Sequence, residues 1–295
     1  MHGIQMEERQ CVALFLITFL VWPAQGVAMN GYREMSKSRS NPVLNMAHSS
    51  LDDQYDGCLK NMKENLTSLL RIELGVSKSY KEAWENALLN CQYNRTWMYP
   101  RNLEELSEVA ICTYTQNDPP FYSEFNAATR KAGKGPREYA DYRFKSLHFL
   151  LTYATRFWRR EVSCQRVYRG TKVNFSIGQY FRFGQFTSTS EKKKVASFFG
   201  KVTFFNLVSC KGIDINEVSS FRNEEEVLIP PYEIFEVKSV NDTVKGKTVH
   251  AVSAGSCSNH NCLFMGEGNR MNANKAFLVE VLALISLPCP HLGLV

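Results

Sequence analysis

Two short segments in the second half of the chain carry residues suited to binding a charged ligand. Arg169 ends a β-rich run and is followed by Gly170; the planar guanidinium suits phosphate or carboxylate, and glycine lets a ligand approach the backbone. Ser188, Thr189 and Ser190 form the second segment, and on a strand Ser188 and Ser190 would share one face, with Thr189 opposite. Taken alone, each segment is typical of an ordinary surface strand.

A third segment places three acids, Glu224, Glu225 and Glu226, directly before the apolar run Val-Leu-Ile-Pro-Pro. Mutual repulsion and adjacent apolar packing raise carboxyl pKa values. If the segment is extended, Glu224 and Glu226 project from one face and could share a site. An acidic surface turn is the alternative interpretation.

The elements that must position these residues differ between the two halves of the chain. Apolar residues at helical spacing predict helices in the first half, and β-rich runs at 164–169, 201–208 and 232–238 predict strands in the second, with a loop at 131–136. Helices followed by strands favour an α+β fold, and no G-x-G-x-x-G follows a strand, which argues against a Rossmann unit. The helical stripes are Leu59, Met62, Leu66, Leu69 and Leu70; Tyr80, Trp84, Ala87 and Leu88; and Leu147, Leu150, Leu151, Ala154, Phe157 and Trp158.

The order of the three segments resembles the R-S-E signature of the cholera-toxin-like mono-ADP-ribosyltransferases, and the surrounding sequence resembles their vertebrate ecto-enzyme branch. The resemblance runs from about Ser50 to about Cys262. It implies a helical N-terminal part packed on a two-sheet β core with an NAD cleft. It also implies transfer of ADP-ribose from NAD⁺, or the related NADP⁺, to protein arginine, without a metal. The further motifs that carry it are Leu51-Asp-Asp-Gln-Tyr-Asp-Gly-Cys58, Phe125-Asn126, Phe144-Lys-Ser-Leu-His-Phe149 and Glu225-Glu-Val-Leu-Ile-Pro-Pro231.

By this resemblance, Arg169 would hold the phosphate and ribose side of NAD⁺, the Gly170 backbone would meet the nicotinamide carboxamide, and Ser188 would orient the catalytic glutamate. Phe199 would stack on nicotinamide, with Phe198 as the alternative. The implied NAD-binding set is Arg169, Gly170, Ser188, Thr189, Ser190 and Phe199.

The same resemblance implies that Glu226 is the catalytic residue. Breaking the nicotinamide–ribose bond develops positive charge on the ribose, which a preorganised carboxylate stabilises. Glu224 fits the position associated with arginine specificity, where it would attract the guanidinium and help remove a proton. Glu225 is the rival for one of these places, and we reject it because the glutamate before Val-Leu-Ile-Pro is the family's catalytic one.

Two other functions remain open at this stage. One is an NAD⁺ glycohydrolase, in which water is the main acceptor; the other is a catalytically inactive cell-surface binding module. The formal net charge of +6 also suggests nucleic acid, but the basic residues are dispersed and form no recognisable nucleic-acid module. A solvated basic face, which would help recruit a diphosphate ligand, fits better.

The 295 residues suffice for one large domain, and the chain carries signs of export. We expect a signal peptide at 1–26, built on the short apolar run 11–22, with an uncleaved signal anchor as the alternative. A lead segment at 27–49 and a catalytic domain at 50–265 follow. The stretch 266–295 is interpreted as a lipid-anchor signal or a hydrophobic tail, since 276–287 is apolar yet contains Glu280.

Sequons and cysteines fit an extracellular or cell-surface location, where arginine-bearing proteins would be the acceptors. The sequons are at Asn65, Asn94, Asn174 and Asn241. The resemblance implies disulfides Cys58–Cys262 and Cys164–Cys210. It leaves Cys91, Cys112, Cys257 and Cys289 unassigned.

Overall fold

The first half of the chain folds into the predicted helices because their apolar residues recur on one face. In the computed structural model, which describes residues 41–91, 100–116, 121–158, 163–244 and 246–266, Met62, Leu66 and Leu70 are buried on one side of α1. Ser77 ends α1 and caps α2, accepting a hydrogen bond from the Tyr80 amide over 3.3 Å. The helices are α1 (Leu59–Val76), α2 (Lys78–Asn90), α3 (Leu103–Thr115), α4 (Phe121–Ala132), α5 (Pro136–Ala140), α6 (Lys145–Phe157) and α7 (Lys193–Phe198), with 3-10 turns η1 (Arg222–Glu224) and η2 (Leu263–Met265).

The apolar pattern predicted α1, α2 and α6 but not α3, α4, α5 or α7. Helix α3 is buried on nearly all sides, from Val109 through Thr115, so it lacks the polar face that makes a helix recognisable from sequence. Helix α4 buries polar residues, Asn126 and Thr129, within its apolar face. The predicted loop at 131–136 is confirmed at 133–135, the short link between α4 and α5, whereas 131–132 belong to α4 and 136 to α5.

The second half forms a sheet in the order β4-β9-β10-β6-β2-β5-β8-β7, beside a two-stranded β1-β3 sheet. A single pair, Tyr168 with Ser190, joins β2 to β5, so the large sheet consists of two parts that meet at one point. In the large sheet, neighbouring strands are antiparallel except β6 and β10, which are parallel; β1 and β3 are also parallel. The strands are β1 (Val43–Leu44), β2 (Gln165–Thr171), β3 (Ser176–Ile177), β4 (Tyr180–Phe181), β5 (Thr187–Ser190), β6 (Thr203–Ser209), β7 (Ile213–Asp214), β8 (Glu226–Ile229), β9 (Glu233–Thr243) and β10 (Gly246–Ser256).

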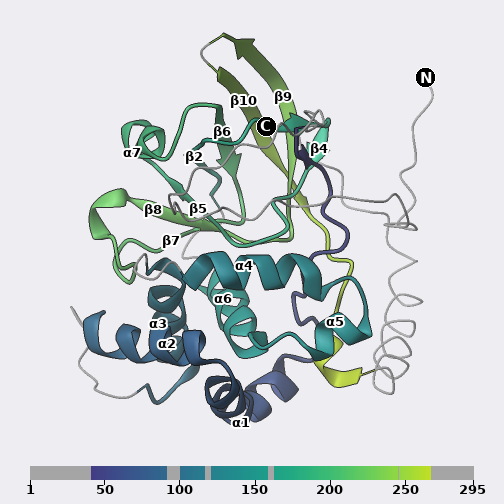
Figure 1. Ribbon diagram of the computed structural model, residues 1–295, viewed down its shortest axis with the longest axis vertical. Helices are drawn as coiled ribbons and strands as arrows, with labels where there is room; N and C mark the ends of the chain where they lie inside the picture. Colours follow the sequence, from purple (N-terminus) through teal and green to yellow (C-terminus); the bar gives the residue numbers. More distant parts are fainter. Residues whose placement is uncertain (1–40, 92–99, 117–120, 159–162, 245, 267–295) are drawn as a thin grey trace, which may run out of the picture.

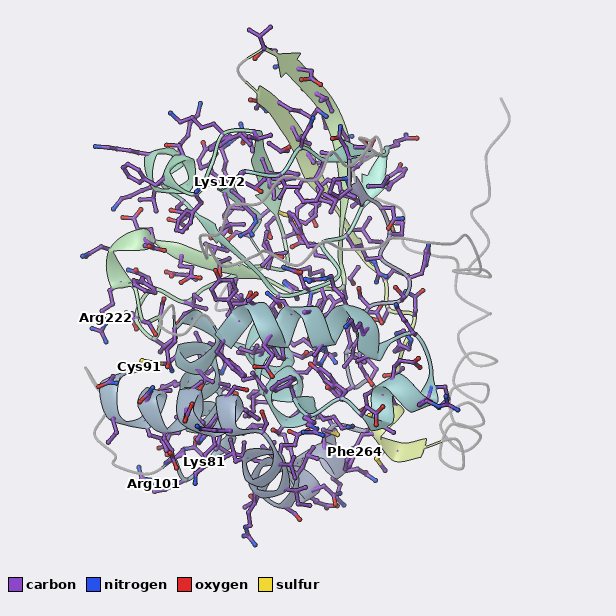
Figure 2. All side chains as sticks on the ribbon, viewed as in Figure 1. Lys81, Cys91, Arg101, Lys172, Arg222 and Phe264 are labelled. Carbon is purple, nitrogen blue, oxygen red and sulfur yellow. A yellow bond between two sulfur atoms is a disulfide. The ribbon has the colours of Figure 1, made fainter. Side chains whose placement is uncertain are left out.

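Helices α1 to α6 lie together below the sheet, with α4 and α6 nearest to β5, β7 and β8, whereas α7 lies beside β2 (Figure 1). Side chains fill the space between the two layers (Figure 2). One apolar core joins the helices to Phe186 and Leu228 of the sheet, and a second lies within the sheet around Val167, Phe205 and Phe235. The expected α+β class, with a helical part packed on a β core, is therefore confirmed.

The N-terminal motif at 51–58 is held by a buried ion pair. Asp52 and Arg182 are both 0% exposed and lie 2.6 Å apart. Burial alone would raise the pKa of Asp52. The hydrogen bond from His260 and the charge of Arg182 outweigh this effect, so the pKa of Asp52 lies below its ordinary value. Asp52 also accepts hydrogen bonds from Asn259, so this one carboxylate connects the motif to β4 and to the C-terminal part of the described chain.

Both expected disulfides, Cys58–Cys262 and Cys164–Cys210, are present. The structure adds a third, Cys91–Cys112, which joins the end of α2 to α3.

Three sequon asparagines, Asn65, Asn174 and Asn241, are exposed, whereas Asn94 lies outside the described residues. The expected signal peptide, most of the lead segment and the C-terminal tail also lie outside them. Within the described part of the chain, no helix has both the length and the apolarity to cross a bilayer.

Candidate active site

Three adjacent strands bring the predicted arginine, serine and glutamate together. Strands β2, β5 and β8 are neighbours, and they carry Arg169, Ser188 and Glu226 respectively. These residues line a narrow cavity of about 50 Å³. The described residues that line it are Tyr168, Arg169, Gly170, Ser188, Thr189, Ser190, Ala196, Phe199, Glu224 and Glu226.

Arg169 is half-buried and held in place by the neighbouring strand. Its Nη1 donates a hydrogen bond to the carbonyl oxygen of Ser188 over 2.6 Å. Burial lowers the pKa of Arg169, whereas nearby groups that include Glu226 raise it by a smaller amount. A guanidinium fixed in this way has an oriented face of N–H donors for an anionic ligand.

Glu226 begins β8 and is only 5% exposed. Its Oε2 accepts a hydrogen bond from Ser219 Oγ over 2.6 Å. Burial raises the pKa of Glu226, while hydrogen bonds from Ser188 and Ser219 and the charge of Arg169 lower it without cancelling the rise. The arrangement keeps one desolvated carboxylate and one half-buried cation in the same cavity.

Glu224 and Glu226 meet in the same cavity, but the segment between them is not extended. Glu224 ends the η1 turn, and Glu225 has left-handed backbone angles, with φ 44° and ψ 58°. This local reversal, rather than strand alternation, brings the two carboxyl groups together. Burial raises the pKa of Glu224, and the negative charge of Glu226 adds to the effect.

Glu225, the rival member of the acidic pair, does not line the cavity. Its carboxylate forms an ion pair with Lys192, and its carbonyl oxygen accepts a hydrogen bond from the Glu191 amide over 3.0 Å. These contacts connect the turn before β8 to the end of β5.

The three hydroxyl side chains of β5 contact different groups. Thr189 Oγ1 donates to the carbonyl of Val227 over 2.8 Å, and Ser190 Oγ donates to the carbonyl of Glu224. Both bonds tie β5 to the acidic segment. The Ser188 hydroxyl is the one that meets the Glu226 carboxylate.

Helix α7 covers the cavity from the side of β2, and Gly170 permits the close approach. A Cβ at Gly170 would lie 2.3 Å from the backbone oxygens of both Ala196 and Gly200. Phe199 follows α7 and lines the cavity with its ring 55% exposed, whereas Phe198 is 74% exposed and is not among the lining residues. The geometry therefore favours the choice of Phe199 over Phe198.

Helix α3 supports the start of β5 through Tyr114. The Tyr114 hydroxyl donates to the Phe186 carbonyl over 2.8 Å and accepts from Asn126 Nδ2 over 3.2 Å. Asn126 is one half of the Phe125-Asn126 motif, so this motif positions the strand that carries Ser188.

A family model described as NAD:arginine ADP-ribosyltransferase matches residues 44–258. The chain belongs to this transferase family. It is 37% identical over 245 residues to an erythroblast NAD(P)(+)--arginine ADP-ribosyltransferase of Gallus gallus, covering 79% of this chain and 80% of that relative. It is 38% identical over 240 residues to the GPI-linked NAD(P)(+)--arginine ADP-ribosyltransferase 1 of Mus musculus, covering 76% of this chain and 74% of the relative.

Solved structures of the transferase family include the eukaryotic mono-ADP-ribosyltransferase ART2.2. The crystal structure of that enzyme matches this fold with a TM-score of 0.65 and 33% identity, covering 75% of this chain and 99% of that one. A variant of ART2.2 has also been solved in complex with NAD, and it matches with a TM-score of 0.65 and 32% identity.

The sequence did not predict that Ser219, Tyr168 and Ala196 belong to the candidate site. Ser219 belongs to no recognisable motif, and only the folded loop brings its hydroxyl to Glu226. Tyr168 and Ala196 flank residues that were predicted, so their neighbours were the available signal. Among the described residues, no group of three histidine, cysteine, aspartate or glutamate side chains is arranged around a metal position.

Proposed function

We propose that this protein cleaves NAD⁺ and transfers its ADP-ribose to arginine side chains of other proteins. Membership of the NAD:arginine ADP-ribosyltransferase family supports the activity. The observation that carries the proposal in this chain is the nearly buried Glu226, which shares one cavity with Arg169, Ser188 and Glu224.

The cavity, which is smaller than nicotinamide itself, would form only the inner part of the site for the reacting end of the dinucleotide. Its volume of about 50 Å³ is well below the roughly 300–1,000 Å³ of typical ligand pockets. Nicotinamide and its ribose would therefore lie between Phe199 and Glu226, with the Gly170 backbone at the carboxamide. Arg169 would meet the ribose and phosphate side, where its fixed guanidinium offers N–H donors.

In the reaction, the bond between the ribose carbon and the nicotinamide nitrogen breaks, and its electron pair leaves with nicotinamide. Positive charge develops on the ribose as the bond breaks. The Glu226 carboxylate therefore stabilises the transition state more than it stabilises the ground state. Ser188 and Ser219 keep that carboxylate oriented through their hydroxyls. A carboxylate fixed before the reaction needs no reorganisation as the charge develops.

The acceptor guanidinium then forms the new bond from one of its nitrogens to the ribose carbon. A guanidinium has a pKa above about 12 and is a poor nucleophile until it loses a proton. Glu224 lies in the same cavity, and its raised pKa makes it a better proton acceptor than an ordinary surface glutamate. The proton thus passes from the acceptor nitrogen to the Glu224 carboxylate.

The test is transfer of labelled ADP-ribose to agmatine and polyarginine. We expect Glu226→Ala to lower transfer by roughly 100- to 1,000-fold, as for loss of one preorganised electrostatic group. Glu224→Ala should lower transfer to arginine far more than it lowers nicotinamide release into water. Glu217→Ala, which removes an exposed acid from the same loop, is the matched control. Substantial transfer by Glu226→Ala would contradict the mechanism.

The second candidate activity is NAD⁺ glycohydrolysis, which the partial solvent exposure of the site favours. It predicts nicotinamide release by the wild-type protein that far outpaces arginine modification. The presence of Glu224 in the cavity supports transfer instead. An inactive binding module would release no nicotinamide at any NAD⁺ concentration.

We further propose that the protein acts at the cell surface, on extracellular arginine-bearing proteins. Relatives named GPI-linked or ecto-enzymes support this location. The same proposal includes a signal peptide at 1–26 and a lipid-anchor signal at 266–295. It also includes glycans on the sequon asparagines. Release of the protein from cells by a phosphatidylinositol-specific phospholipase tests the anchor.

A further inference from the structure

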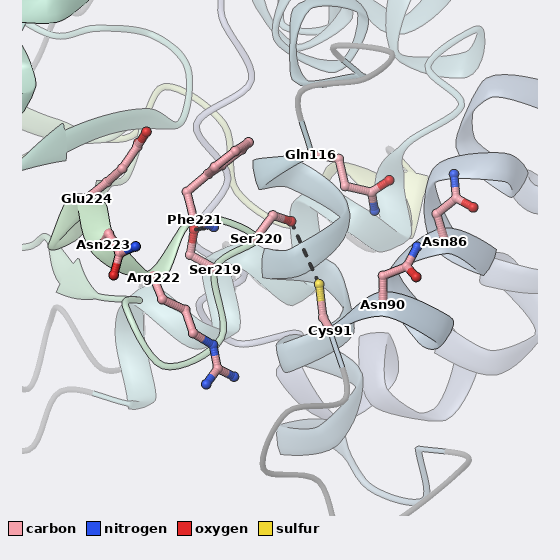
Figure 3. Close-up of a pocket in the computed structure, with 10 residues that line it drawn as sticks. All are labelled: Asn86, Asn90, Cys91, Gln116, Ser219, Ser220, Phe221, Arg222, Asn223 and Glu224. Carbon is pink, nitrogen blue, oxygen red and sulfur yellow. Dashed lines mark hydrogen bonds between the residues drawn. The ribbon is translucent and has the colours of Figure 1, made fainter.

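A second and much larger cavity lies next to the proposed active site. Its volume is about 630 Å³, and it is bounded by α2, by the residue after α3 and by the loop 219–224 (Figure 3). Glu224 lines both this cavity and the smaller one that contains Glu226. The large cavity therefore reaches the residue to which the acceptor guanidinium is assigned.

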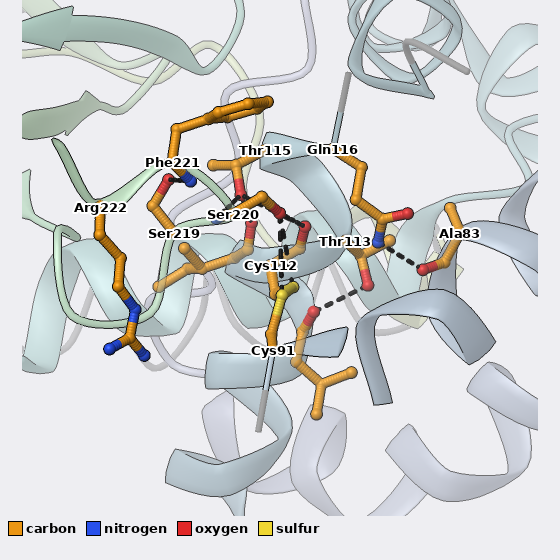
Figure 4. The surroundings of a disulfide bond; sticks show 12 residues. Ala83, Cys91, Cys112, Thr113, Thr115, Gln116, Ser219, Ser220, Phe221 and Arg222 are labelled. Carbon is orange, nitrogen blue, oxygen red and sulfur yellow. Dashed lines mark hydrogen bonds between the residues drawn. A yellow bond between two sulfur atoms is a disulfide. The ribbon is translucent and has the colours of Figure 1, made fainter. Parts of the chain in front are cut away.

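A disulfide and several hydrogen bonds fix the helical wall of this cavity and the loop that faces it. The disulfide Cys91–Cys112 ties the end of α2 to α3, and Ser220 Oγ lies 3.7 Å from Cys91 Sγ (Figure 4). The Ser220 amide donates to Thr115 Oγ1 over 2.9 Å, and its hydroxyl donates to the Cys112 carbonyl over 3.2 Å. A ligand bound here would meet a wall that is already ordered, which lowers the entropic cost of binding.

The loop that forms this wall continues directly into the active site. Ser219, the neighbour of Ser220, donates its hydrogen bond to Glu226. The same short loop thus connects the floor of the large cavity to the catalytic carboxylate.

Side-chain amides give the cavity its chemical character. Asn86 and Asn90 lie one helical turn apart on α2, and Gln116 and Asn223 lie on other walls (Figure 3). A side-chain amide carries both donors and an acceptor, which complements the N–H and C=O of a peptide group. Gln116 already uses one donor on the Ala83 carbonyl over 2.7 Å. Among the described residues that line it, Arg222 and Glu224 are the charged ones, so most of this described surface is indifferent to the charge of a ligand.

We propose that this cavity binds the polypeptide on one side of the target arginine, in an extended conformation, through its peptide groups. The proposal rests on the function proposed above, because it makes the guanidinium bound at Glu224 part of a longer ligand. Peptide groups within a helix or sheet are already hydrogen-bonded to one another. The substrate class is therefore arginine in a flexible or extended segment of a protein, with little requirement on the charge of its neighbours.

The experiment compares two acceptors that carry the same reacting group. One is agmatine, which reaches Glu224 without flanking peptide groups; the other is a capped, flexible seven-residue peptide with arginine at its centre and Gly and Ser elsewhere. The value of kcat/KM is measured for each acceptor with the wild-type protein and the double variant Asn86→Ala/Asn90→Ala. We expect the ratio of the peptide value to the agmatine value to fall about tenfold in the variant, for the loss of two amide contacts.

Lys81→Gln is the control, because Lys81 is exposed on α2 and does not line the cavity. It should leave both values as in the wild-type protein. An unchanged ratio in the double variant, with peptide and agmatine affected equally or not at all, overturns the subsite.

Failure of the proposed function has a different signature. A wild-type protein that releases nicotinamide but modifies neither acceptor would contradict arginine transfer itself, and with it the peptide subsite. A wild-type protein that modifies agmatine, combined with an unchanged ratio in the variant, would contradict only the subsite.

Discussion

Ser219 Oγ donates a hydrogen bond to Glu226 Oε2 over 2.6 Å, at a site where both side chains are buried. The bond stabilises the charged form of the carboxylate, since an ionised oxygen is the stronger acceptor. It is one of the contacts that limit how far burial raises the pKa of Glu226. The charge to which we assign the catalytic role therefore depends on a residue outside the three segments that suggested the site.

Replacing Ser219 with Ala should make Glu226 harder to ionise. The pKa of Glu226 rises further, so the acid limb of the pH profile for nicotinamide release moves to higher pH. We expect the rate at neutral pH to fall by roughly tenfold, as for loss of one hydrogen bond to a charged group. Ser239→Ala, at an exposed position of β9, should leave the profile unchanged. An acid limb that stays in place would argue against the role of Ser219.

Replacing Glu226 with Gln should separate activity from stability. Nicotinamide release should fall by roughly 100- to 1,000-fold because the stabilising charge is lost. The pKa of Glu226 is raised in the folded protein, so the folded state holds this proton more tightly than the unfolded state does. Protonated Glu226 therefore stabilises the folded state at low pH. This contribution to the free energy of unfolding is lost as the pH rises from 4.5, the ordinary pKa, through the raised pKa of the folded state.

At neutral pH, Gln removes that penalty and can still accept the bond from Ser219. Thermal unfolding should accordingly show a Tm at least as high as that of the wild-type protein at pH 7, with the difference shrinking below pH 4.5. A variant that is less stable at pH 7 and no different at low pH would contradict this interpretation.

Replacing Gly170 with Ala should displace α7 from β2. The new Cβ would lie 2.3 Å from backbone oxygens of Ala196 and Gly200, which cannot move as a flexible side chain would. Displacement of Phe199 by about 1 Å would lower kcat/KM for NAD⁺ by up to about 100-fold. Gly75→Ala in α1 is the control, since its Cβ meets nothing within 4 Å and alanine favours the helix. Equal activity of the two variants would exclude the close-packing argument.

Replacing Cys91 and Cys112 together with Ser should loosen the wall that carries Ser220. The disulfide joins residues 21 positions apart, and loops of this length contribute about 3 kcal/mol to the free energy of unfolding. Urea unfolding monitored by tryptophan fluorescence measures the loss. Transfer to agmatine should also decrease, because the same loop holds Ser219 against Glu226. Unchanged stability would show that the hydrogen bonds of Ser220 alone hold the wall.

Local spacing in the sequence was enough to determine many of the helices and strands that support the site. Apolar residues three and four apart predict α1, α2 and α6, because one face of a helix must be buried wherever the helix packs. Runs rich in β-branched and aromatic residues similarly predict β2, β6 and β9. The order of Arg169, Ser188 and Glu226 along the chain carried the family resemblance, which in turn implied two of the three disulfides in the described part of the chain.

Only the tertiary structure decided how those residues meet. The left-handed backbone at Glu225, the bond from Ser219 to Glu226 and the third disulfide depend on contacts between segments that carry no local signal of each other. Gly170 appears in the sequence as one glycine among 17, and α7 alone reveals why no side chain fits there. Periodicity reports which face of an element is buried, whereas the partner that buries it is chosen by packing over the whole fold.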